Sequence, residues 1–237
     1  MIKAIFFDFY NTLVRFSPPV EDIQVAACKE LGVTVTKKGI QRGYSAADDY
    51  FNKENSRSSL FRRPEESRDE FFARYEQMIL KGAGLDVSLN LAQSIWQMTT
   101  LVPKSFVPFD DVIPALRHLK KEGFTLGVLS NLDRDMDSLA QELGLAPYMD
   151  LYITSKDVGA EKPHPPIFLA ALKRAGVSPG QAVHVGDQYH SDVQGARSVG
   201  MMPVLLDRGN WHPEITDCPR VRSLMEVESV VNRVGID

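Results

Sequence analysis

The chain has 237 residues, of which 43% are hydrophobic, and its 27 basic and 31 acidic residues give a formal net charge of −4. The charge balance provides no basic surface for nucleic acid or an anionic membrane, and no apolar run approaches membrane-spanning length. Cys28 and Cys218 lie far apart, without the spacing of a zinc site or a disulfide framework, and no secretory leader pattern opens the sequence. We therefore expect a soluble, cytoplasmic globular protein that binds neither nucleic acid nor membranes.

The first apolar stretch ends in a carboxylate. Residues 2–7 (IKAIFF) are typical of a strand buried on both faces, and Asp8 follows them before a polar turn. In open parallel sheets the carboxyl ends of the strands face the ligand crevice, so Asp8 would lie at a site if this strand is central. The alternative is that Asp8 only begins a turn, as Asp often does.

The next ninety or so positions carry a helical pattern. Apolar residues at helical spacing predict helices near 23–31, 40–51, 71–79 and 91–98. We expect a loop over 52–59 and a capping box from Ser67 to Glu70, and no convincing strand lies between Val14 and Leu101. Residues 15–106 are therefore expected to form a helical insertion.

From Pro108 onward, helices and strands alternate. The patterns predict helices at 112–121, 133–143, 167–175 and 192–199, and strands at 124–129, 151–154, 181–185 and 202–206. A loop is expected over 155–166, and a capping box from Ser223 to Glu226 should open a C-terminal helix. This alternation predicts an α/β fold, a Rossmann-like doubly wound parallel sheet core (residues 1–14 and 107–237) that carries the α-helical domain as an insertion.

Polar residues follow three of the predicted strands, and one proline-rich loop carries a lysine. The candidate site residues are Asp8, Ser130, Asn131, Lys162 and Asp187. An Asp8 carboxylate could attack phosphorus, and Asp187 would supply a second carboxylate for Mg2+. Lys162 would offset negative charge, while Ser130 and Asn131 could hold phosphoryl oxygens.

These residues lie in four ordered motifs. FFDFYNT, LSN, the lysine of EKPHPPIF, and GDQYHSD resemble the motifs of the haloacid dehalogenase-like (HAD) hydrolase superfamily over residues 2–207. The helical segment between the first two motifs resembles the cap of the superfamily's C1-capped group. The resemblance implies that Asp8 is the nucleophile and that Ser130 and Lys162 are its phosphate and charge partners. It also implies that Mg2+ is held by Asp8, the Tyr10 carbonyl and Asp187, and that Asp192 assists through water or Lys162.

The first motif departs from the phosphatase pattern at Tyr10. Phosphatases of the superfamily usually carry DxDxT, and a phenol with a pKa of about 10 is a poor replacement for the second Asp as general acid and base. The DxYxT form resembles the superfamily's 2-haloacid dehalogenases, which displace halide without metal. The fourth motif, from Asp187 to Asp192, instead resembles that of the phosphatases. The dehalogenases also use a cap arginine, and Arg42 lies in the right region without a local match that would assign it.

Three hypotheses follow for the function. The first is a Mg2+-dependent phosphohydrolase that acts on a small phosphorylated metabolite through an aspartyl-phosphate intermediate. The second is a metal-independent 2-haloacid dehalogenase, and the third is a binding or regulatory protein with weak catalysis. His184 is expected in the core, whereas His190, Trp211 and His212 are weaker candidates for the margin of the site.

Overall fold

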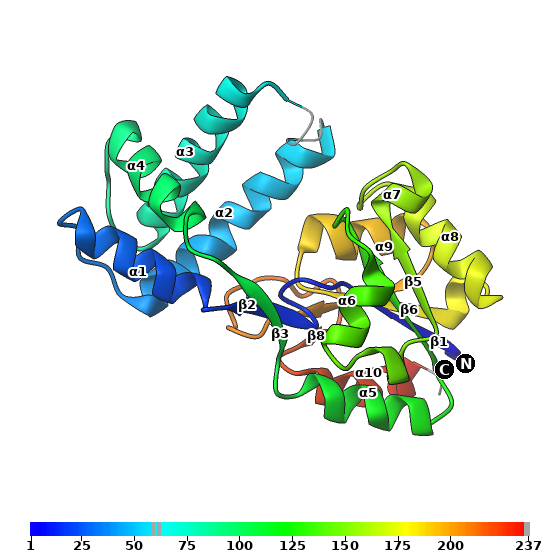
Figure 1. Cartoon of the computed structure of the whole chain (residues 1–237). Coiled ribbons are helices and arrows are strands. Elements are labelled where there is room, and N and C mark those ends of the chain that lie inside the picture. The colour runs from blue at the N-terminus through cyan, green and yellow to red at the C-terminus, as the bar shows by residue number, and fades with distance from the viewer. Residues whose placement is uncertain (58–59, 61–62, 235–237) are drawn as a thin grey trace. The chain divides into compact units, whose positions relative to one another are not determined.

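The computed structural model describes residues 1–57, 60 and 63–234 of the chain (Figure 1). The chain divides into two compact units. The core unit consists of Met1–Arg15 and Val107–Asp237, and the helical unit consists of Phe16–Phe106.

The core unit is built on a six-stranded parallel sheet with the order β5-β4-β1-β6-β7-β8. Its strands are β1 (Ala4–Phe7), β4 (Thr125–Ser130), β5 (Leu151–Thr154), β6 (Ala182–Gly186), β7 (Met202–Leu206) and β8 (Arg220–Val221). The predicted α/β, Rossmann-like fold class is confirmed by this sheet and its flanking helices.

Strand β1 lies inside the sheet, and all four of its residues are buried. Phe7 is paired with Val128 of β4 on one side and with Val185 of β6 on the other. Because parallel strands in register end at the same edge, the residues that follow these three positions lie at one edge of the sheet. Asp8 therefore lies between the carboxyl ends of β4 and β6.

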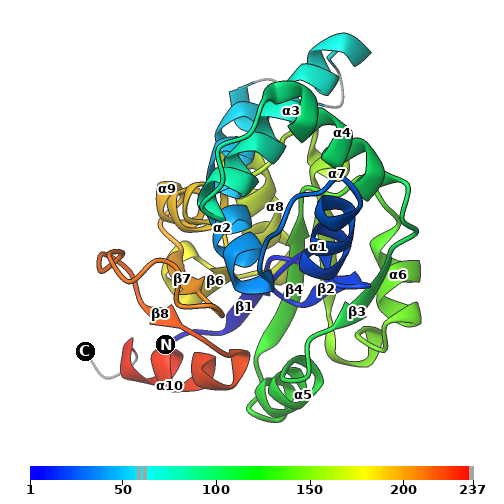
Figure 2. The ribbon, with the colours of Figure 1, turned by 90° about the vertical axis from the view of Figure 1, so that its left-hand side faces the viewer.

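Helices cover both faces of this sheet. They are α5 (Val112–Lys121), α6 (Met136–Glu142), α7 (Ser155–Val158), α8 (Pro165–Ala175), α9 (Gly195–Ser198) and α10 (Val227–Val234). Helices α5 and α10 lie together on one face, whereas α8 and α9 lie on the other (Figures 1 and 2). Helix α8 buries Ile167, Phe168, Ala171 and Leu172 against the sheet. Each large apolar side chain buried in this way stabilises the fold by about 1.5–3 kcal/mol.

Short segments connect these elements. The 3₁₀ turns are η2 (Ala146–Tyr148), η3 (Pro179–Gln181) and η5 (Leu224–Glu226). The helix expected over 192–199 is instead a π-helical segment, η4 (Tyr189–Gln194), continued by the short α9. A Cβ atom at Gly186, the last residue of β6, would lie 2.2 Å from the Asp192 carboxyl carbon. Only glycine therefore lets η4 place Asp192 against the end of β6.

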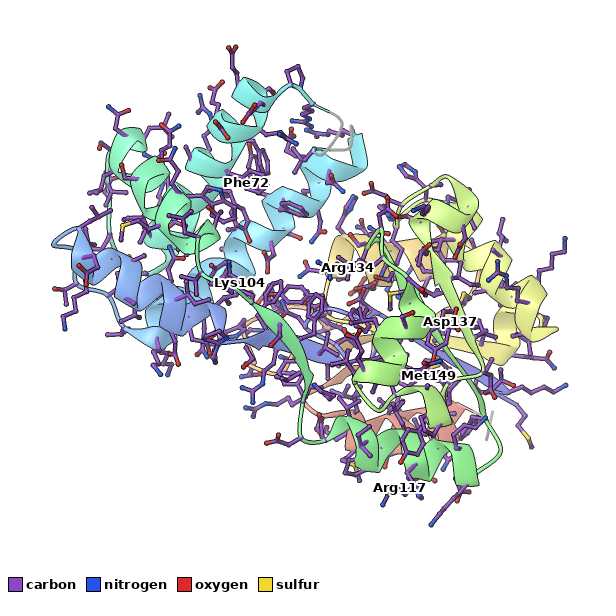
Figure 3. All side chains as sticks on the ribbon, in the orientation of Figure 1. Phe72, Lys104, Arg117, Arg134, Asp137 and Met149 are labelled. Atoms are coloured by element: carbon purple, nitrogen blue, oxygen red, sulfur yellow. The ribbon has the colours of Figure 1, made fainter. Side chains whose placement is uncertain are left out.

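The helical unit contains α1 (Val20–Glu30), α2 (Lys37–Arg57), α3 (Glu65–Gly82) and α4 (Leu89–Thr100). An aromatic cluster forms much of its interior. Phe72, labelled in Figure 3, stacks on Trp96 with ring centroids 4.6 Å apart, and the Tyr75 ring is nearly perpendicular to both. The apolar residues predicted at helical spacing over 71–79, in α3, therefore pack in the interior of the helical unit.

Two short strands join the units. Strands β2 (Val14–Ser17) and β3 (Ser105–Pro108) pair with each other, and Phe16 stacks on Phe106 with centroids 4.9 Å apart. The prediction that no strand lies between Val14 and Leu101 is therefore wrong for residues 14–17, which form β2. Three of the four β2 residues are at least partly exposed, so they show no buried apolar run.

Several expected boundaries are also corrected. Helix α2 continues to Arg57, so residues 52–57 are helical rather than a loop, while 58–59 lie outside the described residues. Helix α3 begins at Glu65, which places Ser67 inside it rather than at its cap. The loop over 155–166 begins with α7, capped by Thr154, and Ser223 caps η5 by accepting from the Met225 N–H. No helix in the described part of the chain is long and apolar enough to cross a membrane.

Candidate active site

Asp8 begins a compact turn, which we call the nucleophile turn and define as residues 8–14. The Asp8 N–H donates to the Val185 carbonyl at 2.8 Å, which fixes the start of the turn on β6. The N–H groups of Leu13 and Val14 both donate to the Phe9 carbonyl, at 2.9 and 3.0 Å. Asn11 reverses the chain with a φ of 61°, a left-handed conformation that Asn tolerates better than most residues. The turn is thus held by its own backbone.

Lys162 connects two carboxylates. Its Nζ atom lies 2.5 Å from Oδ1 of Asp8 and 2.7 Å from Oδ1 of Asp192, and its side chain is only 3% exposed. Burial alone would lower the pKa of Lys162, but the charges of Asp192 and Asp8 outweigh burial and raise it. Lys162 is therefore a permanent cation between two acidic groups.

The two carboxylates differ in environment. Burial raises the pKa of Asp8 to about 6, although Lys162 acts in the opposite direction. For Asp192, burial is opposed by Lys162 and His184, which together hold its pKa below the ordinary value. Asp192 is thus ionised and fixed in place.

Asp192 has further partners that the sequence did not reveal. Its Oδ1 atom lies 2.9 Å from Nε2 of His184, and its Oδ2 atom accepts from the Gln188 N–H at 3.0 Å. Because an ionised carboxylate only accepts, the His184 proton is on Nε2. Burial lowers the pKa of His184 despite this carboxylate, so the ring is neutral. His184 is buried as expected, but no periodicity in a strand signals a partner eight residues later.

Asn131 and Ser130 follow β4 and support the same centre. The Asn131 side chain donates to the Lys162 carbonyl at 3.1 Å and accepts from the Lys162 N–H at 2.7 Å. This pair of bonds holds the backbone at Lys162. Ser130 is buried, and its hydroxyl oxygen accepts from the Leu132 N–H at 3.1 Å. A contact of either residue with phosphoryl oxygens stays a prediction.

Three carboxylates are close enough to share an ion. Asp8, Asp187 and Asp192 each offer an oxygen, and these oxygens lie within 4.8 Å of one another. Hard carboxylate oxygens are the ligands that Mg2+ prefers, so the donor set fits the expected metal. Asp187 Oδ2 accepts from the Gln188 side chain at 2.9 Å. Tyr10 lies in the nucleophile turn and forms a bridge with Val14; its carbonyl stays a predicted ligand.

The weaker candidates have local partners. His190 Nδ1 lies 2.8 Å from the Gln194 side-chain oxygen, one turn further along the chain. The N–H groups of Trp211 and His212 donate to the Asp207 carboxylate at 2.7 and 3.0 Å, which closes the loop after β7.

The fold and the site define a Rossmann-like α/β protein in which a carboxylate at the end of a central strand is paired with a buried lysine. The chain belongs to the haloacid dehalogenase-like hydrolases, whose family model matches residues 2–200. The resemblance drawn from the four motifs is thereby confirmed, and the protein is an enzyme of the hydrolase class.

Named relatives span nearly the whole chain. A glyceraldehyde 3-phosphate phosphatase from Methanopyrus kandleri is 31% identical over 216 residues, which cover 89% of this chain and 86% of the relative. A ribulose-1,5-bisphosphate 5-phosphatase from Halopiger xanaduensis is 26% identical over 239 residues, covering 99% of this chain and 97% of the relative.

Solved structures of a phosphatase and of a dehalogenase are both similar to this chain. A HAD phosphatase from Thermococcus onnurineus matches with a TM-score of 0.57 and 26% identity, covering 97% of this chain and 98% of that one. A 2-haloacid dehalogenase from Pseudomonas syringae pv. Tomato matches with a TM-score of 0.55 and 27% identity, covering 98% and 99%. The family is thus shared by proteins of two different activities.

Proposed function

We propose that this protein is a Mg2+-dependent phosphohydrolase that acts on a small phosphorylated metabolite. Asp8 is the proposed nucleophile, Lys162 and Ser130 its proposed phosphate and charge partners, and Asp8, Asp187 and the Tyr10 carbonyl the proposed metal ligands. The observation that carries the proposal is the group of three carboxylates with oxygens within 4.8 Å of one another around the end of β1. The names of two relatives that span the chain, both sugar-phosphate phosphatases, support the same substrate class.

The arrangement of charges supports a covalent mechanism. A carboxylate oxygen of Asp8 would attack phosphorus, the bond from phosphorus to the leaving oxygen would break, and an aspartyl phosphate would form. Lys162, which contacts Asp8 at 2.5 Å, would balance the negative charge of the phosphoryl group. Water would then attack the phosphorus of this intermediate, releasing phosphate and restoring the carboxylate. Mg2+, when bound, would neutralise the phosphoryl oxygens and reduce their repulsion of Asp8.

Asp192 has a positioning role in this proposal. It accepts from Lys162 at 2.7 Å and is held by His184 and Gln188. It would therefore keep the lysine ammonium beside Asp8 rather than react itself. Asn131 would act in the same way through the lysine backbone.

Tyr10 limits the leaving groups that such a site can expel. An alkoxide needs a proton as it departs, and a phenol supplies one poorly near neutral pH. We therefore propose that phosphoryl compounds with acidic leaving groups, such as aryl phosphate esters and acyl phosphates, are turned over faster than alkyl phosphates.

The test is a screen of p-nitrophenyl phosphate, acetyl phosphate, triose phosphates and pentose phosphates, each with Mg2+ and with excess chelator. We expect phosphate release that depends on Mg2+, with the acidic leaving groups fastest. Phosphate release that is equal in chelator would contradict the metal-dependent mechanism.

Tyr10 favours a second candidate, a metal-independent 2-haloacid dehalogenase, and one similar structure carries that name. In this case Asp8 would displace halide from carbon, forming an ester that water hydrolyses. Arg42, which lies in the region of the dehalogenase arginine, donates through Nε to the Gly82 carbonyl at 2.7 Å. Halide release from 2-chloropropionate in excess chelator would support this candidate, and its absence would remove it.

The third candidate is a binding or regulatory protein that keeps the metal site without useful turnover. It is supported by the missing acidic residue at position 10. Calorimetric titration with Mg2+ and inorganic phosphate would show binding, while every ester and haloacid in the screen would remain intact.

A further inference from the structure

Two buried carbonyl groups of the nucleophile turn accept hydrogen bonds from donors outside the turn. Thr12 and Leu13 are completely buried, and a buried carbonyl without a donor destabilises the fold. The Leu13 carbonyl accepts from the Phe109 N–H at 3.1 Å. The Thr12 carbonyl accepts from Nη2 of Arg208 at 2.9 Å. The donors for both carbonyls therefore come from chain segments distant in sequence.

Arg208 also holds the returning segment, residues 107–111, in which the chain re-enters the core unit. Its Nη1 atom donates to Oδ2 of Asp111 at 2.9 Å, and its guanidinium carbon lies 4.0 Å from the centroid of the Phe109 ring. The same Asp111 oxygen accepts from the Ser223 hydroxyl at 2.7 Å and the Leu224 N–H at 2.9 Å. One side chain thus connects the nucleophile turn, the returning segment and, through Asp111, the start of η5.

Arginine suits this position for geometric reasons. Its planar fork can donate to two acceptors from different nitrogens while its flat face lies on an aromatic ring. A lysine at the same place has a single nitrogen and no planar face, so it could not hold both acceptors from separate nitrogens while stacking flat on the ring. For Asp111, burial alone would raise the pKa, but bonds from Arg208 and Ser223 hold it below the ordinary value, so the pair is ionised.

We infer that Arg208 is a positioning residue for the nucleophile turn, acting on Asp8 and Tyr10 through the Thr12 carbonyl. Asp8 is fixed at the start of the turn by Val185. Arg208 fixes the other end, so the path of Tyr10 between them is set from both sides. The effect of Arg208 on Mg2+ rests on the proposed function, whereas its effect on the turn does not.

The primary test is amide hydrogen exchange of the metal-free protein, read at the amides of residues 11, 13 and 14. Arg208→Met removes both donors while keeping much of the apolar stem. We expect exchange at these amides to increase about tenfold or more, because a hydrogen bond to a charged donor stabilises its partner by enough for such a change. Amides in β4 should change much less.

Arg220 provides the matched control. It is also an arginine of the core unit, and its side chain donates to the Asp207 carboxylate and to the Asn210 side-chain oxygen, each at 2.8 Å, rather than to a carbonyl of the nucleophile turn. Arg220→Met should lower the melting temperature without selective exchange in residues 11–14. If Arg208→Met and Arg220→Met raise exchange uniformly over the core unit, Arg208 is only a structural residue and the inference is overturned.

A conservative variant covers the case in which Arg208→Met does not fold. Arg208→Lys keeps the positive charge but loses the fork, so we expect a selective increase in exchange at the same three amides, smaller than for methionine. Exchange equal to that of the unmodified protein would overturn the inference.

Mg2+ binding gives a second measurement. Titration calorimetry should show Mg2+ affinity reduced several-fold in Arg208→Lys and unchanged in Arg220→Lys, because a looser turn presents the Tyr10 carbonyl less well. If the unmodified protein binds no Mg2+, the proposed function fails. The exchange measurement on metal-free protein still decides the role of Arg208.

Discussion

Lys162 and Asp192 form a buried ion pair, with Nζ and Oδ1 2.7 Å apart and neither side chain more than 3% exposed. Such a pair is weak evidence for stability, since taking both charges from water costs about as much as their attraction returns. Its value here lies in geometry, because the ammonium cannot move away from Asp192 and so stays beside Asp8.

Asp8→Asn should abolish turnover of every substrate that the protein accepts, because an amide cannot form the covalent intermediate. We expect kcat to fall by roughly a thousandfold or more, as for loss of other covalent nucleophiles. Rapid-quench detection of phosphorylated protein would confirm the missing intermediate. Asp137→Asn, on an exposed position of α6, should retain the original rate. Full activity in Asp8→Asn would remove the covalent mechanism for either enzymatic hypothesis.

His184→Leu should reduce kcat with little change in KM, because His184 reaches Asp192 and, in the proposed role, not the substrate. The lost donor is worth about 1.5–3 kcal/mol at a charged acceptor, which corresponds to roughly tenfold or more in rate. His184→Gln can place a side-chain N–H near the position of Nε2 and should retain most of the activity. Equal rates in the two variants would mean that the hydrogen bond to Asp192 does not matter.

Tyr10→Asp should increase turnover of alkyl phosphates, since a carboxyl group can protonate the departing alkoxide. General acid catalysis contributes about 10²- to 10⁴-fold, so an increase of tenfold or more is expected on triose phosphates. The rate with p-nitrophenyl phosphate should change less, because its leaving group needs no proton. Tyr10→Phe serves as the control and should leave both rates near their original values. Unchanged alkyl-phosphate turnover in Tyr10→Asp would show that position 10 is not a general-acid position.

A buried carboxyl group in the helical unit predicts a pH-dependent stability. Glu76 is completely buried and accepts from the Gln24 side-chain amide, and its Oε2 atom has no hydrogen-bond partner among the described residues. Burial raises the pKa of Glu76 to about 8. Between pH 5 and pH 8 the folded state therefore binds a proton that the unfolded chain releases, so stability falls as the pH rises.

Glu76→Gln should remove this component. The difference in unfolding free energy between Glu76→Gln and the unmodified protein should grow in favour of glutamine by up to about 1.4 kcal/mol per pH unit in this range. Urea unfolding at pH 5, 6.5 and 8 would measure it. Glu70→Gln, which changes an exposed partner of Arg74 on the same helix, should show no such trend. A constant difference for Glu76→Gln across the three pH values would mean that the carboxyl group ionises normally.

Much of the core unit is predictable from the sequence because its strands are continuous apolar runs between helices. The bounds predicted for the strands over 151–154 and 202–206 and for the helix over 112–121 are the bounds that the structure has. The pattern of apolar residues did not predict elements that are short or half-exposed, such as β2. The extension of α2 to Arg57 is also missed, because its last turns carry charged side chains that pair with one another, as Arg57 does with Glu54.

Some residues of the site could likewise be predicted from the sequence, and others could not. Asp8, Ser130, Lys162 and Asp187 can be found because each follows an apolar strand or lies between helix breakers. His184 and Arg208 cannot, because their partners are fixed by the way η4 and the loop after β7 fold onto the sheet. A strand pattern reports that a residue is buried, but not which polar atom it meets.

The position of β1 within the sheet also determines when the site can be assembled. Phe7 pairs with Val128 and Val185, and both partners follow the helical unit in the chain. The helical unit has its own apolar cluster and can bury it as soon as it has been translated. Strand β1, made first on the ribosome, must wait for two long chain closures before either edge is paired. Asp8 is fixed only after Val185 has emerged, so the proposed nucleophile is among the first residues synthesised and among the last to be positioned.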